Sequence, residues 1–333
     1  MKYNLLTILL LFISCMLIFL LESWMMIWMI MELNTLMFIN FLILNNKYNY
    51  YSPIKYFLVN SFSSAIFISM IMLNLMYKSE IINNIIILTM FIKLGMPPFH
   101  FWFMDMMNKN NWLTILILST LQKLIPFFIT INYIHYSKMN NFYFLYWMTC
   151  MSGLWSNMAS INQSKLKVIM GYSSITHMSW MMMTLLESNI MWLIYFLCYS
   201  MINFIIFFMI MKNVNIITLM DMIKNLEKTY YVLWVFMSIS SIPPLFGFLT
   251  KWMITIKCIN LYHFFMLIIL MIFSLIYLYY YVRSSYLSMM LNLNKPKIKF
   301  NYKKIPLKNK KIMTILLSIN MTGLLMIFIW LNI

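Results

Sequence analysis

The chain has 333 residues, of which 63% are hydrophobic and 9% are charged, and its mean hydropathy is +0.83. These values exclude a soluble globular protein, in which about 25% of the residues are charged. The apolar runs are continuous over roughly 20 residues, which is the length of a membrane-spanning helix, whereas a transmembrane barrel shows alternating segments of about ten. The sequence therefore predicts an all-α polytopic membrane protein.

Residue usage gives two further indications. The chain contains 39 Met but only 5 Gly, and Arg283 is its single arginine, a bias typical of AT-rich genomes such as those of many mitochondria. The cysteines occur singly, without the C-x-x-C spacing of a metal cluster or the density of a disulfide framework. They are Cys15, Cys150, Cys198 and Cys258.

Apolar runs separated by polar residues predict eleven transmembrane spans. Residues 1–21 begin like a signal peptide, but no cleavage site follows, so we interpret them as a retained first span. The spans lie at about 3–21, 24–44, 55–76, 81–107, 112–133, 142–161, 167–185, 190–211, 230–258, 261–282 and 312–331. We expect residues 1–333 to form a single transmembrane domain, with a basic loop at about 283–311 before the last span.

Positive charge in the loops predicts the orientation. An odd number of spans puts the termini on opposite sides of the membrane, and cationic loops stay in the compartment of synthesis. Eighteen Lys and Arg residues fall on the side of the N-terminus, and only Lys78, Lys138 and Lys257 fall on the other side. We therefore predict that the N-terminus faces the matrix, if the protein is mitochondrial. This asymmetry and attraction to anionic lipid explain the net charge of +17 without a nucleic-acid partner.

Two spans carry residues that interrupt a helix. The fourth contains Lys93-Leu-Gly-Met-Pro-Pro-Phe-His-Phe-Trp102, and the ninth contains Ser241-Ile-Pro-Pro-Leu-Phe-Gly-Phe-Leu-Thr-Lys251. Proline removes a helical hydrogen bond, and interrupted spans in corresponding places are typical of transporters built from inverted repeats. The lysine precedes the break in one span and follows it in the other, as expected of inverted copies. The sequence thus predicts broken helices at about 81–107 and 230–258.

Charged side chains also lie inside the predicted spans, where charge is energetically expensive. Lys93, Lys123 and Lys251 have no loop to belong to, and Glu32 lies about eight residues, or ~12 Å, into the second span. Burial favours the neutral forms of carboxylates and amines, whereas pairing favours the charged forms, so such groups are able to exchange protons near neutral pH. We therefore interpret them as a proton relay. The alternative is that the lysines extend to the membrane interface and that Glu32 caps a short or tilted span.

Histidines give a weaker indication. His177 lies mid-span in Gly171-Tyr-Ser-Ser-Ile-Thr-His177, among hydroxyl groups able to hold water. It would either extend the relay or act as a hydrogen-bonded core residue. His100, beside the first break, is expected to be structural. No phosphate-binding loop, nucleophile motif, metal cluster or redox-ligand set is recognisable, so we do not expect this chain to carry electrons.

Five motifs resemble those of one family, the antiporter-like proton-pumping subunits of respiratory complex I. They are Trp28-Met-Ile-Met-Glu-Leu-Asn34, Lys93-Leu-Gly-Met-Pro-Pro-Phe-His-Phe-Trp102, Leu121-Gln-Lys-Leu-Ile-Pro126, Tyr172-Ser-Ser-Ile-Thr-His-Met178 and Pro244-Leu-Phe-Gly-Phe-Leu-Thr-Lys-Trp252. The resemblance implies a pair formed by Glu32 and Lys93 in a first half-channel. It also implies that Lys123 is a central lysine and Lys251 a terminal one. Pro97 is a departure, because relatives often have Ala there.

The resemblance further implies proton translocation in the mitochondrial inner membrane. NADH, FMN, iron–sulfur clusters and ubiquinone are expected in other subunits, and no cofactor in this chain. The expected partners are other membrane-arm subunits and phospholipids such as cardiolipin, with no nucleic acid. Two alternatives are a free-standing cation/proton antiporter and a passive scaffold in which the buried charges only fix helix packing.

Overall fold

The computed structural model describes residues 2–45, 50–137, 143–212, 236–243, 245–259, 264–293 and 318. The elements formed by these residues are helices, which confirms the predicted fold class. The chain divides into two compact units, Met1–Met151 and Ser152–Ile333, and each is described by itself.

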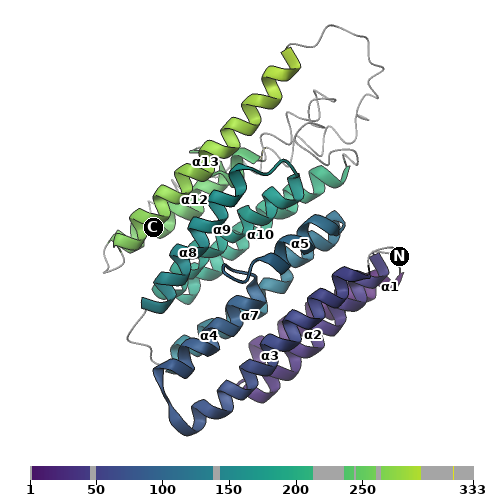
Figure 1. Cartoon of the computed structure of the whole chain (residues 1–333), viewed down its shortest axis with the longest axis vertical. Helices are drawn as coiled ribbons and strands as arrows, with labels where there is room; N and C mark the ends of the chain where they lie inside the picture. Colours follow the sequence, from purple (N-terminus) through teal and green to yellow (C-terminus); the bar gives the residue numbers. More distant parts are fainter. Residues whose placement is uncertain are drawn as a thin grey trace. The chain divides into compact units, whose positions relative to one another are not determined.

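The first unit is built from helices packed mostly against their neighbours in the chain. Helix α1 packs against α2, α2 against α3, α3 against α4, and α4 against the more distant α7. Figure 1 shows α2 and α3 side by side along much of their length. The helices are α1 (Lys2–Leu17), continued by the 3-10 turn Ile18–Leu20, α2 (Trp24–Asn45), α3 (Tyr51–Tyr77), α4 (Glu80–Leu94), α5 (Phe101–Lys109), α6 (Trp112–Ser119), α7 (Leu121–Ser137) and the first part of α8 (Tyr143–Ile161).

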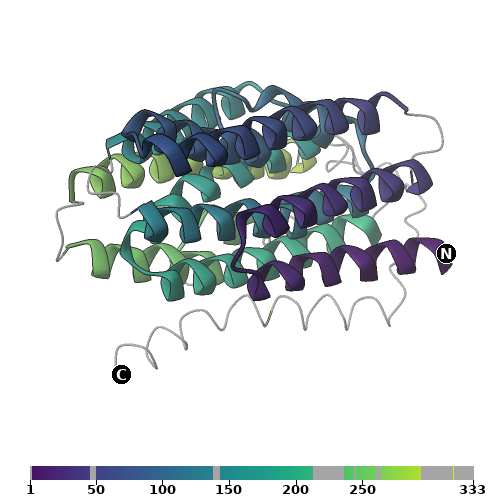
Figure 2. The same cartoon turned by 90° about the horizontal axis from the view of Figure 1, so that it is seen from below.

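The described part of the second unit is built from the rest of α8 and the helices that follow it. Helix α9 packs against α10, α10 against α12, and α12 contacts both α9 and α13. Within each unit the helices run roughly parallel or antiparallel to one another (Figure 2). The helices are α9 (Leu166–Glu187), α10 (Asn189–Lys212), α12 (Phe246–Ile259) and α13 (Phe264–Leu293), and residues 236–239 are also helical.

The predicted break in the fourth span is confirmed between α4 and α5. Helix α4 ends at Gly95, whose φ of +69° is a left-handed conformation that favours glycine. A Cβ atom at Gly95 would also lie 2.6 Å from the Phe103 Cβ atom. The Ile92 carbonyl accepts from the Gly95 N–H at 3.2 Å and also from the indole N–H of Trp102 at 3.0 Å, so Trp102 adds a second bond at this helix end. Glycine is thus required at this break by both backbone and packing.

The predicted break in the ninth span is confirmed as well. The helical residues 236–239 end in a turn, Ser241 has a φ of 63°, and α12 begins at Phe246. A Cβ atom at Gly247 would lie 1.9 Å from the Ser238 carbonyl oxygen. Gly247 therefore allows the two sides of this break to approach closely.

A third interruption was not predicted. The span expected at 112–133 is divided at Thr120, whose φ of −118° and ψ of −80° are not helical, so that α6 ends at Ser119 and α7 begins at Leu121. The segment around this point, Ser119-Thr-Leu-Gln-Lys123, contains no Gly or Pro, which is why the sequence did not reveal the interruption. Pro126, inside α7, lacks the N–H that would otherwise bind the Gln122 carbonyl.

The first ten predicted spans each overlap helical residues, and the eleventh, at 312–331, lies outside the described residues apart from Ser318. Helix α13 continues to Leu293, beyond the predicted span end at 282, and the rest of the predicted basic loop lies outside the described residues. Five stretches of the described chain are long and apolar enough to cross a membrane. They are Trp24–Asn45, Tyr51–Tyr77, Trp112–Tyr136, Asn189–Phe208 and Phe264–Arg283.

Candidate functional site

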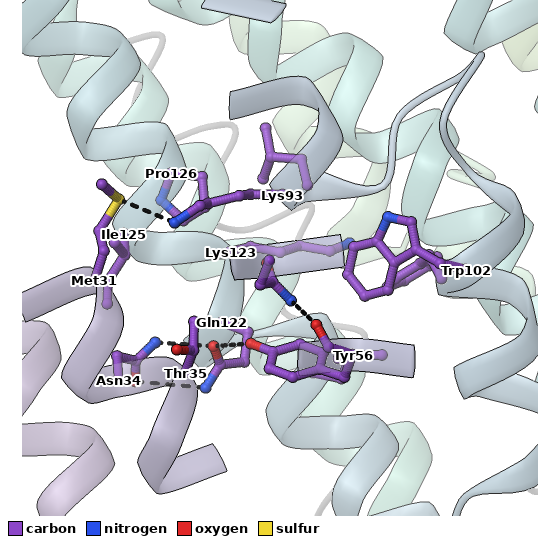
Figure 3. Close-up of a pocket in the computed structure, with 14 residues that line it drawn as sticks. Met31, Asn34, Thr35, Tyr56, Lys93, Trp102, Gln122, Lys123, Ile125 and Pro126 are labelled. Atoms are coloured by element: carbon purple, nitrogen blue, oxygen red, sulfur yellow. Dashed lines mark hydrogen bonds between the residues drawn. The ribbon is translucent and has the colours of Figure 1, made fainter. Parts of the chain in front are cut away.

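A cavity inside the first unit brings two of the predicted relay lysines together (Figure 3). It is lined by residues of α2 to α7, including Lys93 and Lys123. A volume of about 20 Å³ is open to the centre of a water molecule. Since one water requires roughly 10–15 Å³ measured in this way, the cavity has room for water beside the two amines.

Both lysines are buried, and both lie beside a helix interruption. Lys93 is 8% exposed and lies in the last turn of α4, whereas Lys123 is 2% exposed and is the third residue of α7. The Lys93 Nζ atom lies 3.5 Å from the Met31 sulfur, and the Lys123 Nζ atom lies 5.2 Å from the Phe103 ring centroid. Figure 3 shows the two side chains extending in opposite directions. A thioether is a weak acceptor and a phenyl ring a modest partner for a cation, so water and a nearby carboxylate become important.

Glu32 is that nearby carboxylate. It is half-buried in α2, the Ser64 hydroxyl donates to one carboxylate oxygen, and the Thr35 hydroxyl lies 3.5 Å from the other. Glu32 and Lys93, both described residues, form no direct ion pair, but the carboxylate acts on the Lys93 amine electrostatically. The structure thus places both residues of the pair implied by the resemblance in the same unit, without direct contact.

The cavity wall includes a polar network that the sequence analysis did not single out. The Gln122 side-chain oxygen accepts hydrogen bonds from the Asn34 amide and the Tyr56 hydroxyl, each at 2.9 Å. Ser14 donates to the Asn34 side-chain oxygen at 3.2 Å, so the network joins α1, α2, α3 and α7. Asn34 and Gln122 stand inside the recognised motifs, but no spacing in the sequence pointed to Tyr56.

The second unit holds the other two predicted relay residues, His177 and Lys251. His177 is 3% exposed, and its Nδ1 atom lies 2.9 Å from the Tyr195 hydroxyl. The Tyr195 hydroxyl also interacts with the side chain of Thr250, the neighbour of Lys251 in α12. Lys251 is 7% exposed, and its Nζ atom lies 5.8 Å from the Trp180 ring centroid. Tyr195, which the sequence analysis missed, therefore joins His177 to the segment that carries Lys251.

His100, expected to be structural, precedes α5 at the first break. The ring centroids of His100 and Phe101 lie 4.3 Å apart, and the ring planes are tilted by 30°. In the described part of the chain, no three His, Cys, Asp or Glu side chains group closely enough to hold a metal ion.

Comparison with known sequences identifies the family. Residues 21–277 match the family model described as NADH:quinone oxidoreductase/Mrp antiporter, TM. NADH-ubiquinone oxidoreductase chain 2 of Anopheles gambiae is 33% identical over 287 residues, which cover 82% of each chain. The protein of the same name from Suricata suricatta is 32% identical over 313 residues, which cover 89% of each chain.

Solved structures share the fold at low sequence identity. A chain of respiratory complex I from Thermus thermophilus with bound aureothin superposes with a TM-score of 0.80 at 18% identity, over 98% of this chain and 78% of that chain. A chain of the Mrp complex from Dietzia sp. gives a TM-score of 0.65 at 13% identity, over 77% of this chain and 55% of that one. The chain therefore belongs to the NADH:quinone oxidoreductase/Mrp antiporter family and, within it, to the group of NADH-ubiquinone oxidoreductase chain 2.

Proposed function

We propose that this chain, an antiporter-like membrane subunit of NADH:ubiquinone oxidoreductase, relays protons through Glu32, Lys93, Lys123, His177 and Lys251. One observation carries the proposal. Each of the three lysines is at most 8% exposed, and each lies within about two turns of a helix interruption. Buried charge and broken helices are each costly, and their repeated coincidence supports a functional role.

The interruptions favour proton transfer for a physical reason. A helix end leaves backbone N–H and C=O groups without helical partners, and inside a membrane such groups are tolerated where water or protein satisfies them. Water held at a break is thereby brought next to an amine that is able to gain or lose a proton. In the first unit this arrangement coincides with the cavity lined by Lys93 and Lys123.

The chemistry that drives the relay belongs to other subunits. We propose that NADH, FMN, iron–sulfur clusters and ubiquinone bind elsewhere in the complex, and that this chain holds no cofactor. Its partners are other subunits of the membrane arm and phospholipids such as cardiolipin, and no nucleic acid is involved. Residues 1–333 act as one transmembrane domain of the mitochondrial inner membrane, with the N-terminus on the matrix side. The excess of cationic loop residues on that side supports this orientation.

Substitution of Lys123 tests the relay. Lys123→Met removes a buried charge without adding bulk, so the complex should assemble, but it should pump fewer protons per NADH oxidised. Lys123→Arg should be nearly as harmful, because a guanidinium stays protonated and does not hand its proton on. Proton uptake and NADH oxidation would be measured on the purified complex in proteoliposomes. The matched control is Lys165→Met at an exposed lysine.

An unchanged proton-to-NADH ratio in an assembled Lys123→Met complex would return Lys123 to a role in helix packing. The likeness to a chain of an Mrp complex suggests a second candidate function, which is cation/proton exchange by this chain alone. Sodium- or potassium-dependent proton exchange by this chain reconstituted without its partners would favour that function.

A further inference from the structure

Two contacts fix the register of α9 against α12 in the second unit. The Lys251 Nζ atom lies 5.8 Å from the Trp180 ring centroid, and the Cys258 thiol lies near enough to the Glu187 carboxylate to interact with it electrostatically. Glu187 follows Trp180 by seven residues in α9, and Cys258 follows Lys251 by seven residues in α12. Seven residues are close to two helical turns and rise about 10.5 Å, so Lys251 and Glu187 lie along the same line between the two helices.

Hydroxyl groups occupy the intermediate turn on both helices. Thr184, four residues after Trp180, is fully buried, and Thr255, four residues after Lys251, is half-buried. Each hydroxyl donates to a carbonyl of its own helix, Thr184 to Met181 at 2.6 Å and Thr255 to Trp252 at 2.8 Å. A hydroxyl oxygen still accepts hydrogen bonds while it donates one, so both are able to hold water between Lys251 and Glu187.

The remaining distance suits a short chain of water molecules. Hydrogen-bonded oxygens lie about 2.8 Å apart, so a rise of about 10.5 Å corresponds to roughly four such steps. On another side of α12, Leu249 and Met253 pack with Met191 of α10 in an apolar cluster. The polar line therefore follows the face of α12 that contacts α9.

Glu187 is placed where this line reaches the end of the helix. It is the last residue of α9, it is half-buried, and the following Ser188 is in an extended conformation. Burial raises the pKa of the Glu187 carboxyl above its usual value, which favours uptake of a proton, while the exposed Lys257 acts electrostatically in the opposite direction. In the predicted orientation this end of α9 faces away from the matrix.

We propose that Glu187 accepts the proton released by Lys251 and passes it to the aqueous side away from the matrix. The Lys251 ammonium becomes a neutral amine, the proton moves through hydroxyl-bound water, and the Glu187 carboxylate becomes a carboxylic acid that then loses the proton to solvent. No electrons are transferred. The inference rests on the proposed relay role of Lys251.

Glu187→Gln is the decisive variant, because it keeps the size and hydrogen-bonding capacity of the side chain but removes the proton acceptor. In the purified complex in proteoliposomes, it should lower the number of protons pumped per NADH as much as Lys251→Met does. Glu187→Asp, which keeps a carboxylate, should retain most of the pumping. Glu80→Gln, at an exposed carboxylate in the first turn of α4, is the matched control and should match the unsubstituted complex.

The outcomes separate this inference from the relay itself. Normal pumping by Lys251→Met would overturn the relay role of that lysine. Reduced pumping by Lys251→Met together with normal pumping by Glu187→Gln would overturn only the role of Glu187. If Glu187→Gln does not assemble, infrared difference spectra of the turning-over complex decide. A carboxylic acid band that shifts in Glu187→Asp is the expected result, and a band that is absent or unshifted would overturn the inference.

Discussion

The neighbours of the buried amines have a feature in common at the scale of single residues. Lys93 contacts a methionine sulfur, while Lys123 and Lys251 lie over the aromatic rings of Phe103 and Trp180. A carboxylate in direct contact would hold an ammonium ion in place, whereas sulfur and ring faces interact with it more weakly. The sulfur of Met31 thus allows Lys93 to gain or lose a proton without breaking a strong ion pair, and the ring faces of Phe103 and Trp180 interact with either protonation state of the amines beside them.

Tyr195 gives the first prediction at this scale. Tyr195→Phe removes the hydroxyl that is hydrogen-bonded to His177 and interacts with Thr250, but leaves the ring in place. Loss of a buried partner should cost about 1–3 kcal/mol of stability, and the pumped protons per NADH should fall because His177 is no longer linked to α12. Thermal inactivation and proton uptake of the assembled complex measure the two effects. Tyr279→Phe on the exposed side of α13 is the control. Normal pumping in Tyr195→Phe would exclude this link from the relay.

Gln122 gives a second prediction, on stability. Gln122→Leu leaves the Asn34 amide and the Tyr56 hydroxyl without their shared acceptor. Each buried donor left unsatisfied costs about 1–3 kcal/mol, so the assembled complex should inactivate at a lower temperature. Gln163→Leu is the control, because Gln163 accepts from Tyr280 through its backbone carbonyl and not its side chain. Equal inactivation temperatures for the two variants would show that the network contributes nothing to stability.

At the scale of helices, the interruptions give the lysines different electrostatic surroundings. Lys93 lies in the last turn of α4 and Lys123 in the first turn of α7. A cation is stabilised at a helix C-terminus and destabilised at an N-terminus by about 0.3–1 kcal/mol. The two helix ends therefore favour a positive charge at Lys93 over one at Lys123, although both amines line the same cavity.

A prediction for the first break concerns Gly95. Gly95→Ala forces a left-handed conformation on a residue with a Cβ atom, at a cost of about 1–2 kcal/mol, and creates a contact of 2.6 Å with Phe103. The variant should assemble poorly, as native gel electrophoresis of the membrane fraction would measure. Ser69→Ala on the exposed face of α3 is the control and should assemble normally. Normal assembly of Gly95→Ala would show that this break tolerates a different backbone path.

These helices also show what the sequence was able to predict. Pro and Gly mark the breaks after Lys93 and before Lys251, so both were predicted from local chemistry. The break at Thr120 has no such residue, and the contact between His177 and Tyr195 joins two helices whose facing sides no local pattern specifies. Glu187 lies at the end of a predicted span, where a carboxylate is ordinarily solvated, so its position in the sequence did not mark it as a site residue. The sequence predicts which residues are unusual, while packing decides what they touch.

At the scale of the whole molecule, the orientation across the membrane is open to a direct test. Lys78→Cys and Lys165→Cys replace exposed lysines that the predicted topology places on opposite sides of the membrane. A membrane-impermeant maleimide should label Lys78→Cys, but not Lys165→Cys, in mitochondria whose outer membrane has been removed. Both should be labelled after the inner membrane is made permeable, and the unsubstituted chain, with its native cysteines, gives the background. The reverse pattern would overturn the predicted matrix location of the N-terminus.

The burial of α9 has a consequence for biogenesis. Every residue from Val168 to Leu185 is buried, and many of them are polar, so α9 is absent from the described stretches that are apolar enough to cross a membrane by themselves. If helices are inserted one at a time, α9 alone should partition poorly into lipid. Its entry into the bilayer should therefore wait for α10 and α12, so that the helix carrying His177 and Glu187 is inserted together with the helix carrying Lys251.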